Sequence, residues 1–498
     1  MTPQPLQPPP QQPQQQKTFL PVVLLLVFGA LACCGGVFAL GAYGAYNEAK
    51  DKQLAGKTSK TTPTTDSTDT TDDDTGDDPA TPTPRPKSEE DALREEFAQE
   101  MVAQLEVDGK PGFTYDRKHF RLANKSGELM ELTNFFDEYK ALEEDQRLAY
   151  VEKISAGFGK EDLPDSWSGA KGQVLVTVRD RITLELVPIR TGVKESPLTR
   201  PLADDLVQVV VYDGPDNMQY LTQANLDRWG IDADELFLEG KKQLVARSKK
   251  PFAQASPGVY ESKWADNHDV ARALLGEQLK KLKLKGEPLV FLPQRDHLVI
   301  TGSTDKRGQE AAAELVDTYL ALPRANSGRG WVVKSDGTFD PWIPPEGSRF
   351  AELRQQALAA DANDQKKALD EKFEKDGTDI FVGTTLFTED DDDKPLTYAV
   401  WTKGADTLMP KADFIVLVDI DRPEPDRVIG AAPWDHVVKI AGARIKPDPS
   451  YWPLRYRLKT FPDAKQVKAI GLHHFFTRNK NGKDATDTKG EDDESDGD

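Results

Sequence analysis

The stretch LVFLPQRDHLVIT, residues 289–301, places two short apolar runs on either side of a polar turn. The runs at 289–292 and 298–301 are rich in aliphatic and β-branched residues, and Gln294, Arg295 and Asp296 separate them. This pattern predicts a β-hairpin. A helical pattern follows at about residues 306–322. Hairpin-connected strands that arrive in clusters with helices are typical of α+β folds.

Similar patterns extend toward the N-terminus and a little beyond the hairpin. Helices are expected from Ser88, which has a capping pattern with Asp91, then over about 135–154 and over 225–245 with a break near Gly230. The expected strands are 113–122 and 129–132 around a turn at 124–127, then 174–178, the alternating Ile182, Leu184 and Leu186, 206–212, and a small hairpin of 331–333 and Phe339 around Asp336-Gly337. Residues 88–345 are therefore predicted to form an α+β domain with a largely antiparallel sheet.

A second α+β domain is expected over residues 346–477. A helical stretch rich in Ala, Leu and Gln begins near Ser348, and a strand at 380–387 leads through the acidic turn 389–393 to a partner strand at 397–401. Further strands are expected at 414–418 and 454–458. The soluble region is long enough for two cores, because single cores usually stop growing beyond roughly 300 residues.

Several short segments of residues 88–345 resemble the YtpQ-like bacterial proteins. The segments are Phe120-Arg121-Leu122, Glu131-Leu132-Thr133-Asn134-Phe135-Phe136, Leu186-Val187-Pro188-Ile189-Arg190, the strand 205–212, Gln219-Tyr220-Leu221-Thr222 and Val299-Ile300-Thr301-Gly302. The family is uncharacterised, so the resemblance implies a fold and carries over no catalytic residue. The apolar N-terminal run and the C-terminal domain depart from the simple family pattern.

Residues 19–46 form an apolar run without a charged side chain. A helix needs about 20 apolar residues to cross a hydrocarbon core, so the run predicts a single transmembrane helix through which the chain would contact a membrane. The flanking segments have the composition of disordered chain: a Pro/Gln-rich tail at 1–18, a Thr/Asp/Pro-rich linker at 47–87 and an acidic tail at 478–498.

Two alternatives to a permanent span are a cleaved signal peptide and a lipid-modified cysteine at Cys33 or Cys34. Only Lys17 precedes the run, and apolar residues continue past both cysteines, which disfavours both alternatives. The lysine count on the two sides places the large region in the cytoplasm, since Lys50, Lys52, Lys57 and Lys60 follow the run. The stalk-like composition of the linker favours the outside, and that orientation is our prediction.

Composition excludes some classes of partner. The 498-residue chain has a formal net charge of -20 and a pI near 4.9, so it should repel phosphate backbones, and nucleic acid is not an expected partner. Both cysteines lie in the run 19–46, which leaves the predicted soluble region without a disulfide framework or a thiolate metal site.

Candidate chemical motifs are weak, and no catalytic, cofactor-binding or metal-binding residue is assigned. Gly56-Lys57-Thr58 lacks the strand that precedes a phosphate-binding loop. The acidic turn 389–393 lacks the ligand spacing of a calcium-binding loop. Ser303 is expected to be a cap or turn residue, because no nucleophile motif surrounds it. His268 is the most suggestive histidine, but the neighbouring Asp266 or Asn267 is expected to cap a helix. His473 and His474 are adjacent, which is the wrong spacing for one helical metal face, and Trp401 and Trp434 beside His436 are expected in the core.

These observations favour a membrane-anchored, non-catalytic binding or scaffolding protein of the bacterial cell envelope, with an envelope protein or other envelope ligand as partner. The alternative is a membrane-tethered enzyme with an unrecognised active site. Paired polar groups in a deep pocket would favour the enzyme, and a flat apolar patch would favour binding.

Overall fold

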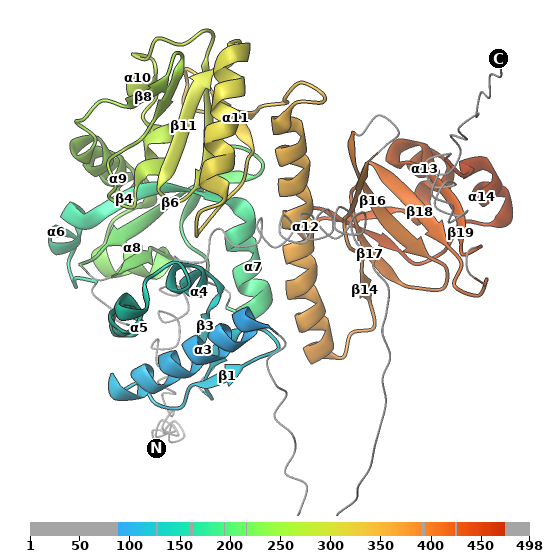
Figure 1. The fold of residues 1–498 in the computed structure, drawn as a ribbon, viewed down its shortest axis with the longest axis horizontal. Coiled ribbons are helices and arrows are strands. Elements are labelled where there is room, and N and C mark those ends of the chain that lie inside the picture. Colours follow the sequence, from blue (N-terminus) through green and yellow to red (C-terminus); the bar gives the residue numbers. More distant parts are fainter. Residues whose placement is uncertain are drawn as a thin grey trace, which may run out of the picture.

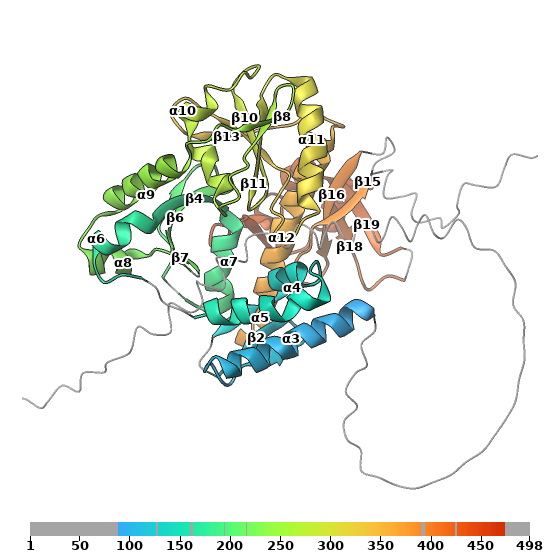
Figure 2. The same cartoon turned by 60° about the vertical axis from the view of Figure 1, so that its left-hand side comes forward.

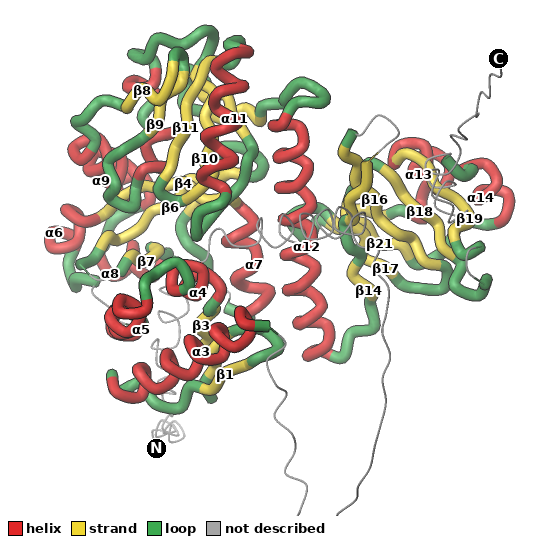
Figure 3. Tube along the Cα trace, viewed as in Figure 1, coloured by secondary structure: helices red, strands yellow, loops and turns green. Residues whose placement is uncertain are grey.

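The computed structural model describes residues 88–125, 128–159, 163–193, 195–215, 217–389, 394–423 and 426–473. Within these ranges the chain forms an N-terminal unit (88–159), a central unit (163–345) and a C-terminal unit (377–473), with one long helix, α12, between the last two. Figure 1 shows α12 standing between the larger body and the C-terminal unit, and Figure 3 shows helices and sheets in both.

The N-terminal unit is a three-stranded antiparallel sheet covered by helices. Ser88 caps its first helix by accepting a hydrogen bond from the Asp91 N–H at 3.1 Å, as the sequence predicts. The hairpin around residues 124–127 is also confirmed on the described positions. Phe97 and Phe136 are fully buried in the core of this unit. Its elements are α3 (Glu89–Val107), β1 (Thr114–Asp116), β2 (Arg121–Ala123), β3 (Leu129–Glu131), α4 (Thr133–Tyr139) and α5 (Glu144–Gly157).

The first sheet of the central unit is built on β6, which pairs antiparallel with β4, β5 and β7. The strands predicted at 174–178 and 206–212 are confirmed, and so is the break at Gly230, which has a left-handed backbone with φ of 66°. The elements of this half are α6 (Trp167–Ala170), η2 (Lys171–Gln173), β4 (Val174–Asp180), α7 (Arg181–Thr191), β5 (Thr199–Pro201), β6 (Leu206–Asp213), β7 (Met218–Tyr220), α8 (Gln223–Trp229) and α9 (Ala233–Arg247).

The second sheet of the central unit has six strands in the order β13-β12-β10-β11-β9-β8. Its middle is the predicted hairpin of residues 289–301, in which Phe291 pairs with Val299, and α11 packs on it as expected. The elements of this half are β8 (Ala253–Ser256), β9 (Val259–Glu261), η3 (Asp269–Leu274), α10 (Gly276–Leu279), β10 (Pro288–Gln294), β11 (His297–Gly302), α11 (Lys306–Leu320), β12 (Gly330–Val333) and β13 (Phe339–Pro341).

The strand predicted from the alternation of Ile182, Leu184 and Leu186 is wrong, because these residues lie in helix α7. Ile182 and Leu186 are buried and stand four residues apart, which puts them on one helical face. They pack together with Ala368 of α12. The short alternation fits both periods, and packing against the neighbouring helix decides between them.

Helix α12 (Arg349–Asp376) begins after Ser348, whose side chain accepts from the Ala351 N–H. Helix α12 contacts both the central unit and the C-terminal unit. In its first turn, Phe350 stacks on Phe291 of β10. Further along, Ala368 packs with Ile182 and Leu186 of α7. Near its end, Leu369 and Phe373 pack with Val382 and Leu408 of the C-terminal unit.

The C-terminal unit holds two four-stranded sheets, in the orders β15-β16-β18-β19 and β14-β17-β21-β20. The pairs β14–β17 and β16–β18 are parallel and the other pairs are antiparallel. The single strand predicted at 380–387 is instead two strands, β14 and β15, which belong to different sheets. Between them, the Thr385 N–H donates to the side chain of Asn363 of α12 and so does not pair with a strand. The elements are β14 (Phe381–Val382), β15 (Leu386–Glu389), β16 (Pro395–Thr402), β17 (Thr407–Pro410), β18 (Phe414–Val418), β19 (Val428–Pro433), α13 (Trp434–Ala441), η4 (Gly442–Arg444), β20 (Lys446–Asp448), β21 (Arg455–Leu458) and α14 (Ala464–Ile470).

The fold class needs one correction. It is α+β with mostly antiparallel sheets, but among the described helices none combines the length and the apolarity that a membrane span requires. The 28-residue α12 is long enough, yet charged side chains occur along its whole length. The run 19–46, on which the predicted transmembrane helix and single-pass architecture rested, lies outside the described residues, as do the segments 1–18, 47–87 and 478–498. The described architecture therefore contains no transmembrane element.

Candidate functional site

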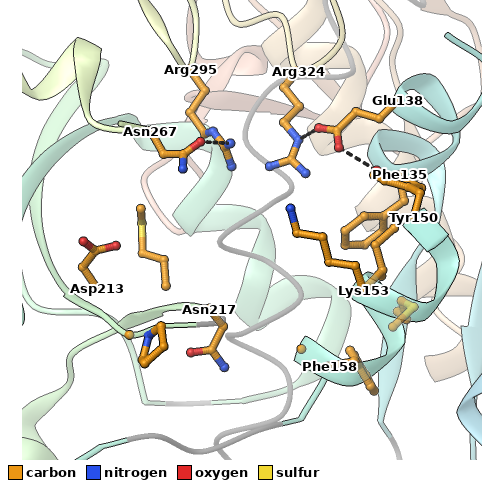
Figure 4. A pocket seen from close by; sticks show the side chains of 16 residues that line it. Phe135, Glu138, Tyr150, Lys153, Phe158, Asp213, Asn217, Asn267, Arg295 and Arg324 are labelled. Carbon is orange, nitrogen blue, oxygen red and sulfur yellow. Dashed lines mark hydrogen bonds and ion pairs between the residues drawn. The ribbon is translucent and has the colours of Figure 1, made fainter. Parts of the chain in front are cut away.

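A cavity of about 450 Å³ lies where the N-terminal unit meets the central unit. Figure 2 shows the two helices that supply one wall, α4 and α5, below the body of the central unit, and Figure 4 shows the cavity from close by. The lining residues are Met130, Phe135, Glu138, Tyr150, Lys153, Ile154, Gly157, Phe158, Asp213, Gly214, Pro215, Asn217, Met218, Asn267, Arg295 and Arg324.

One wall of the cavity is apolar. Phe135 of α4 and Phe158, which follows α5, are almost fully buried, and Ile154 packs against the same core. Phe158 is fixed by an edge-to-face contact with Phe113, with ring centroids 5.6 Å apart. The wall is therefore a rigid extension of the core of the N-terminal unit.

Three cationic side chains reach the same cavity from separate elements. Lys153 comes from α5, Arg295 from the turn between β10 and β11, and Arg324 from the segment after α11. Figure 4 shows the amine of Lys153 and the guanidinium of Arg324 directed toward a shared space, with Arg295 beside Arg324. The lining also holds the carboxylates of Glu138 and Asp213, so an anion is attracted only by the positive charge that these carboxylates leave uncompensated.

The three cations differ in how far the protein neutralises them. Arg324 forms an ion pair with Glu138, and Arg295 donates to Asn267 at 2.9 Å and lies 3.4 Å from Asp296. Lys153 forms no ion pair within the described part of the chain, and its side chain is exposed. One positive charge is thus left for a ligand.

Two of the lining residues have a left-handed backbone, with φ of 62° at Asn267 and 59° at Arg324. Asparagine tolerates this region, but for arginine it is unfavourable. Strained residues of this kind persist only where the surrounding structure enforces them, and they cluster at binding and active sites. The strain at Arg324 accompanies a side chain that enters the cavity and pairs with Glu138.

Two titratable residues of the cavity lining, Asp213 and Tyr150, have shifted pKa values. Burial raises the pKa of Asp213, but the neighbouring His268 and the hydrogen bond that Arg247 donates outweigh burial and hold that pKa below the ordinary value. Burial and the neighbouring Glu138 raise the pKa of Tyr150, whose hydroxyl donates to Glu138 at 2.6 Å. Asp213 therefore remains an anion and Tyr150 remains protonated.

His268, the histidine that the sequence singles out, lies behind this wall. It is buried, its Nε2 is 3.3 Å from Asp213 Oδ1, and it does not line the cavity. Asp266 accepts a hydrogen bond from the His268 N–H at 3.1 Å and pairs with Arg272. This bond precedes η3, whose N-cap is His268 itself with no side-chain cap, so the expected helix cap at Asp266 or Asn267 is wrong.

The other sequence candidates do not meet at this cavity. Ser303 lies in the turn that follows β11, as expected, and its hydroxyl accepts a hydrogen bond from the distant Glu287 N–H at 3.0 Å. Trp401 and Trp434 are buried in the core of the C-terminal unit, as expected. The motif 56–58, the acidic residues 390–393 and His474 lie outside the described residues. Within the described ranges, no group of three or more His, Cys, Asp or Glu side chains is arranged to hold a metal ion.

Comparisons with protein-family models, with curated proteins and with solved structures found no match to this chain. The resemblance to the YtpQ-like family therefore stays a prediction.

Proposed function

We propose that this protein is a non-catalytic binding protein, and that the cavity between its N-terminal and central units binds a small carboxylic acid with an apolar body. The observation that carries the proposal is the convergence of Lys153, Arg295 and Arg324 beside an apolar wall. A single carboxylate suits this site because Lys153 is the one of the three cations that lacks an ionic partner in the described chain.

The size and the lining of the cavity support a small ligand. A volume of about 450 Å³ falls in the usual range of small-molecule sites, roughly 300–1,000 Å³. Such sites combine apolar surface with a few placed polar groups, here the amides of Asn217 and Asn267 and the three cations. The apolar body would lie on Phe135, Ile154 and Phe158.

Binding is favoured over catalysis by the chemistry of the lining. The described lining residues include no serine, threonine, cysteine or histidine, which are common nucleophiles and proton carriers. Its two carboxylates, Glu138 and Asp213, are held in ion pairs, and the pKa of Asp213 is lowered away from neutrality. A general acid or base works best with a pKa near the operating pH.

The test compares acids with their uncharged amides. Thermal unfolding of the full chain is followed with 3-phenylpropionate, hexanoate and the two corresponding amides. We expect the acids to raise the unfolding temperature and the amides to have little effect, because a ligand that binds only the folded state stabilises it.

Lys153→Met should remove most of the acid-induced stabilisation, while the matched variant Lys249→Met should keep it. Lys249 is an exposed lysine of the central unit outside the cavity lining. Equal stabilisation by acids and amides, or none by any of the four compounds, would contradict the proposal.

A further inference from the structure

A second cavity, of about 600 Å³, lies in the C-terminal unit and is strongly basic. It is formed by the end of α13, η4, the paired strands β20 and β21, and α14. The lining residues are Ala441, Ala443, Arg444, Lys446, Arg457, Lys459, Thr460 and Gln466. Four cations thus line one cavity in a chain whose formal net charge is -20.

The strand register forces two of these cations together. Lys446 of β20 is the direct partner of Arg457 of β21 in an antiparallel pair, so both side chains leave the same face of the sheet. Like charges placed directly opposite each other destabilise a sheet. Lys459 lies two residues beyond Arg457, just past the end of β21, so it is expected on the same face of the sheet. An anion on this face would neutralise Lys446 and Lys459.

The protein supplies carboxylates to only half of the cluster. Arg457 donates to Asp406 at 2.7 Å, and Arg444 lies 3.5 Å from Asp463. Lys446 and Lys459 are exposed and have no ion pair within the described residues. Two positive charges therefore face solvent from one cavity.

We propose that this cavity binds the acidic C-terminal segment of the same chain, residues 491–498. The segment EDDESDGD carries six acidic side chains and no basic one. The description ends at residue 473, shortly after α14, whose Gln466 lines the cavity. About 18 residues separate positions 473 and 491, and an extended chain of that length spans roughly 60 Å, which is ample for the segment to return.

Covalent connection favours this occupant over a free anion. A segment tethered next to its site has an effective concentration that reaches the millimolar range, so even weak ionic contacts can fill the cavity. A free acidic peptide or inorganic phosphate must then compete with the segment. The full chain should therefore bind an added acidic peptide poorly.

The experiment measures fluorescence anisotropy of a labelled peptide of residues 490–498 at low salt. The titrants are the full chain and a chain that ends at Thr477. We expect the shortened chain to bind the peptide at least tenfold more tightly than the full chain. Binding should weaken as salt is raised, because exposed charges are screened.

Matched double variants of the shortened chain locate the site. Lys446→Ala with Lys459→Ala should weaken peptide binding at least tenfold, whereas Lys249→Ala with Lys250→Ala, which removes the same charge from exposed positions of the central unit, should not. The proposal is overturned if the shortened chain does not bind the peptide, if both chains bind it equally, or if the two double variants behave alike. Tighter binding of inorganic phosphate to the full chain than to the shortened chain would also overturn it, because the segment should compete with phosphate.

Discussion

Two junctions between parts of this chain are built in opposite ways. The junction of the N-terminal and central units leaves a cavity of about 450 Å³, in which Lys153 has no ionic partner among the described residues. The seam at the middle of α12, which is residues 361–369 with the side chains packed against them, is filled by apolar contacts and buries Arg329, Asp361 and Arg455. The difference separates a surface prepared for a ligand from one that holds the structure together.

Arg329 of the central unit is the main charge of the seam on one side. Its guanidinium lies 2.7 Å from Asp361 of α12, 3.2 Å from Asp205 and 3.5 Å from Asp180. All of these side chains are buried or nearly so. Arg329 is therefore the cation that compensates several carboxylates buried away from water. This cluster attaches α12 to the central unit.

Arg455 of the C-terminal unit binds the next turn of α12 through hydrogen bonds to neutral groups and not through ion pairs. It is fully buried and donates to neutral acceptors, which include the Ala362 carbonyl, the Gln365 side chain and the Gly383 carbonyl at 2.7 Å. Burial lowers the pKa of Arg455 to about 9, so it remains charged at neutral pH. A buried arginine from each side thus holds α12.

The largest effect is expected from Arg329→Met at pH 8. The substitution leaves carboxylates buried without their cation, and breaking a buried ion pair in this way costs about 3–5 kcal/mol. Urea unfolding of the full chain measures the loss. The exposed-site control Lys249→Met should change the free energy of unfolding by less than about 0.5 kcal/mol. A loss below about 1 kcal/mol for Arg329→Met would show that the seam does not depend on this cluster.

The pH dependence of stability tests the same cluster. Burial, with the neighbouring Asp361 and Asp205, raises the pKa of Asp180 to about 7, although Arg329 and Arg179 oppose the rise. The folded state therefore binds more protons than the unfolded state between about pH 4 and 7. Stability should fall as pH rises through this window, by at most about 4 kcal/mol from this residue, since one pKa unit corresponds to about 1.4 kcal/mol.

Asp180→Asn is the matched variant for that measurement. Asparagine has no proton to lose, so the fall in stability between about pH 4 and 7 should become smaller. Part of the fall should remain, because burial also raises the pKa of Asp361. An unchanged slope in Asp180→Asn would contradict the assignment.

Arg455→Met should have a smaller effect than Arg329→Met. It strips hydrogen bonds from buried carbonyl groups but leaves no carboxylate unpaired, and the expected loss is about 2–3 kcal/mol. The same urea titration measures it. If Arg455→Met cost more than Arg329→Met, the carboxylates would not be the decisive difference between the two sides of the seam.

Lys153→Met should change the stability of the ligand-free protein least, by less than about 0.5 kcal/mol, because the side chain is exposed and has no ionic partner to lose in the described chain. Urea unfolding without added ligand checks it. A loss of 2 kcal/mol or more would place Lys153 among the structural charges and remove the contrast with the seam.

Much of the fold was predictable from local signals, because hairpins and caps are decided within a few residues. The hairpin of 289–301 and the cap at Ser88 follow from residue types alone. Helix α7 was not predictable from its short alternation, since the contact with Ala368 that selects the helical period comes from a segment far along the chain. The split of β14 and β15 likewise depends on Asn363 of α12.

The candidate site was not predictable at all. Lys153, Arg295 and Arg324 are far apart in the sequence and belong to no motif. Arg295 is visible in the sequence only as part of a hairpin turn, which places it on a surface but names no neighbour. His268 attracts attention by its residue type, whereas the structure buries it behind the cavity wall. Only the packing of the two units brings the cations together.

The most direct test of the central claim is isothermal titration calorimetry of the full chain with the acid that gives the largest thermal shift. The cavity assignment predicts one binding event, which Lys153→Met weakens at least tenfold, about 1.4 kcal/mol, and which Lys249→Met leaves unchanged. Equal affinity of the unaltered chain and of Lys153→Met would show that the acid does not bind in this cavity.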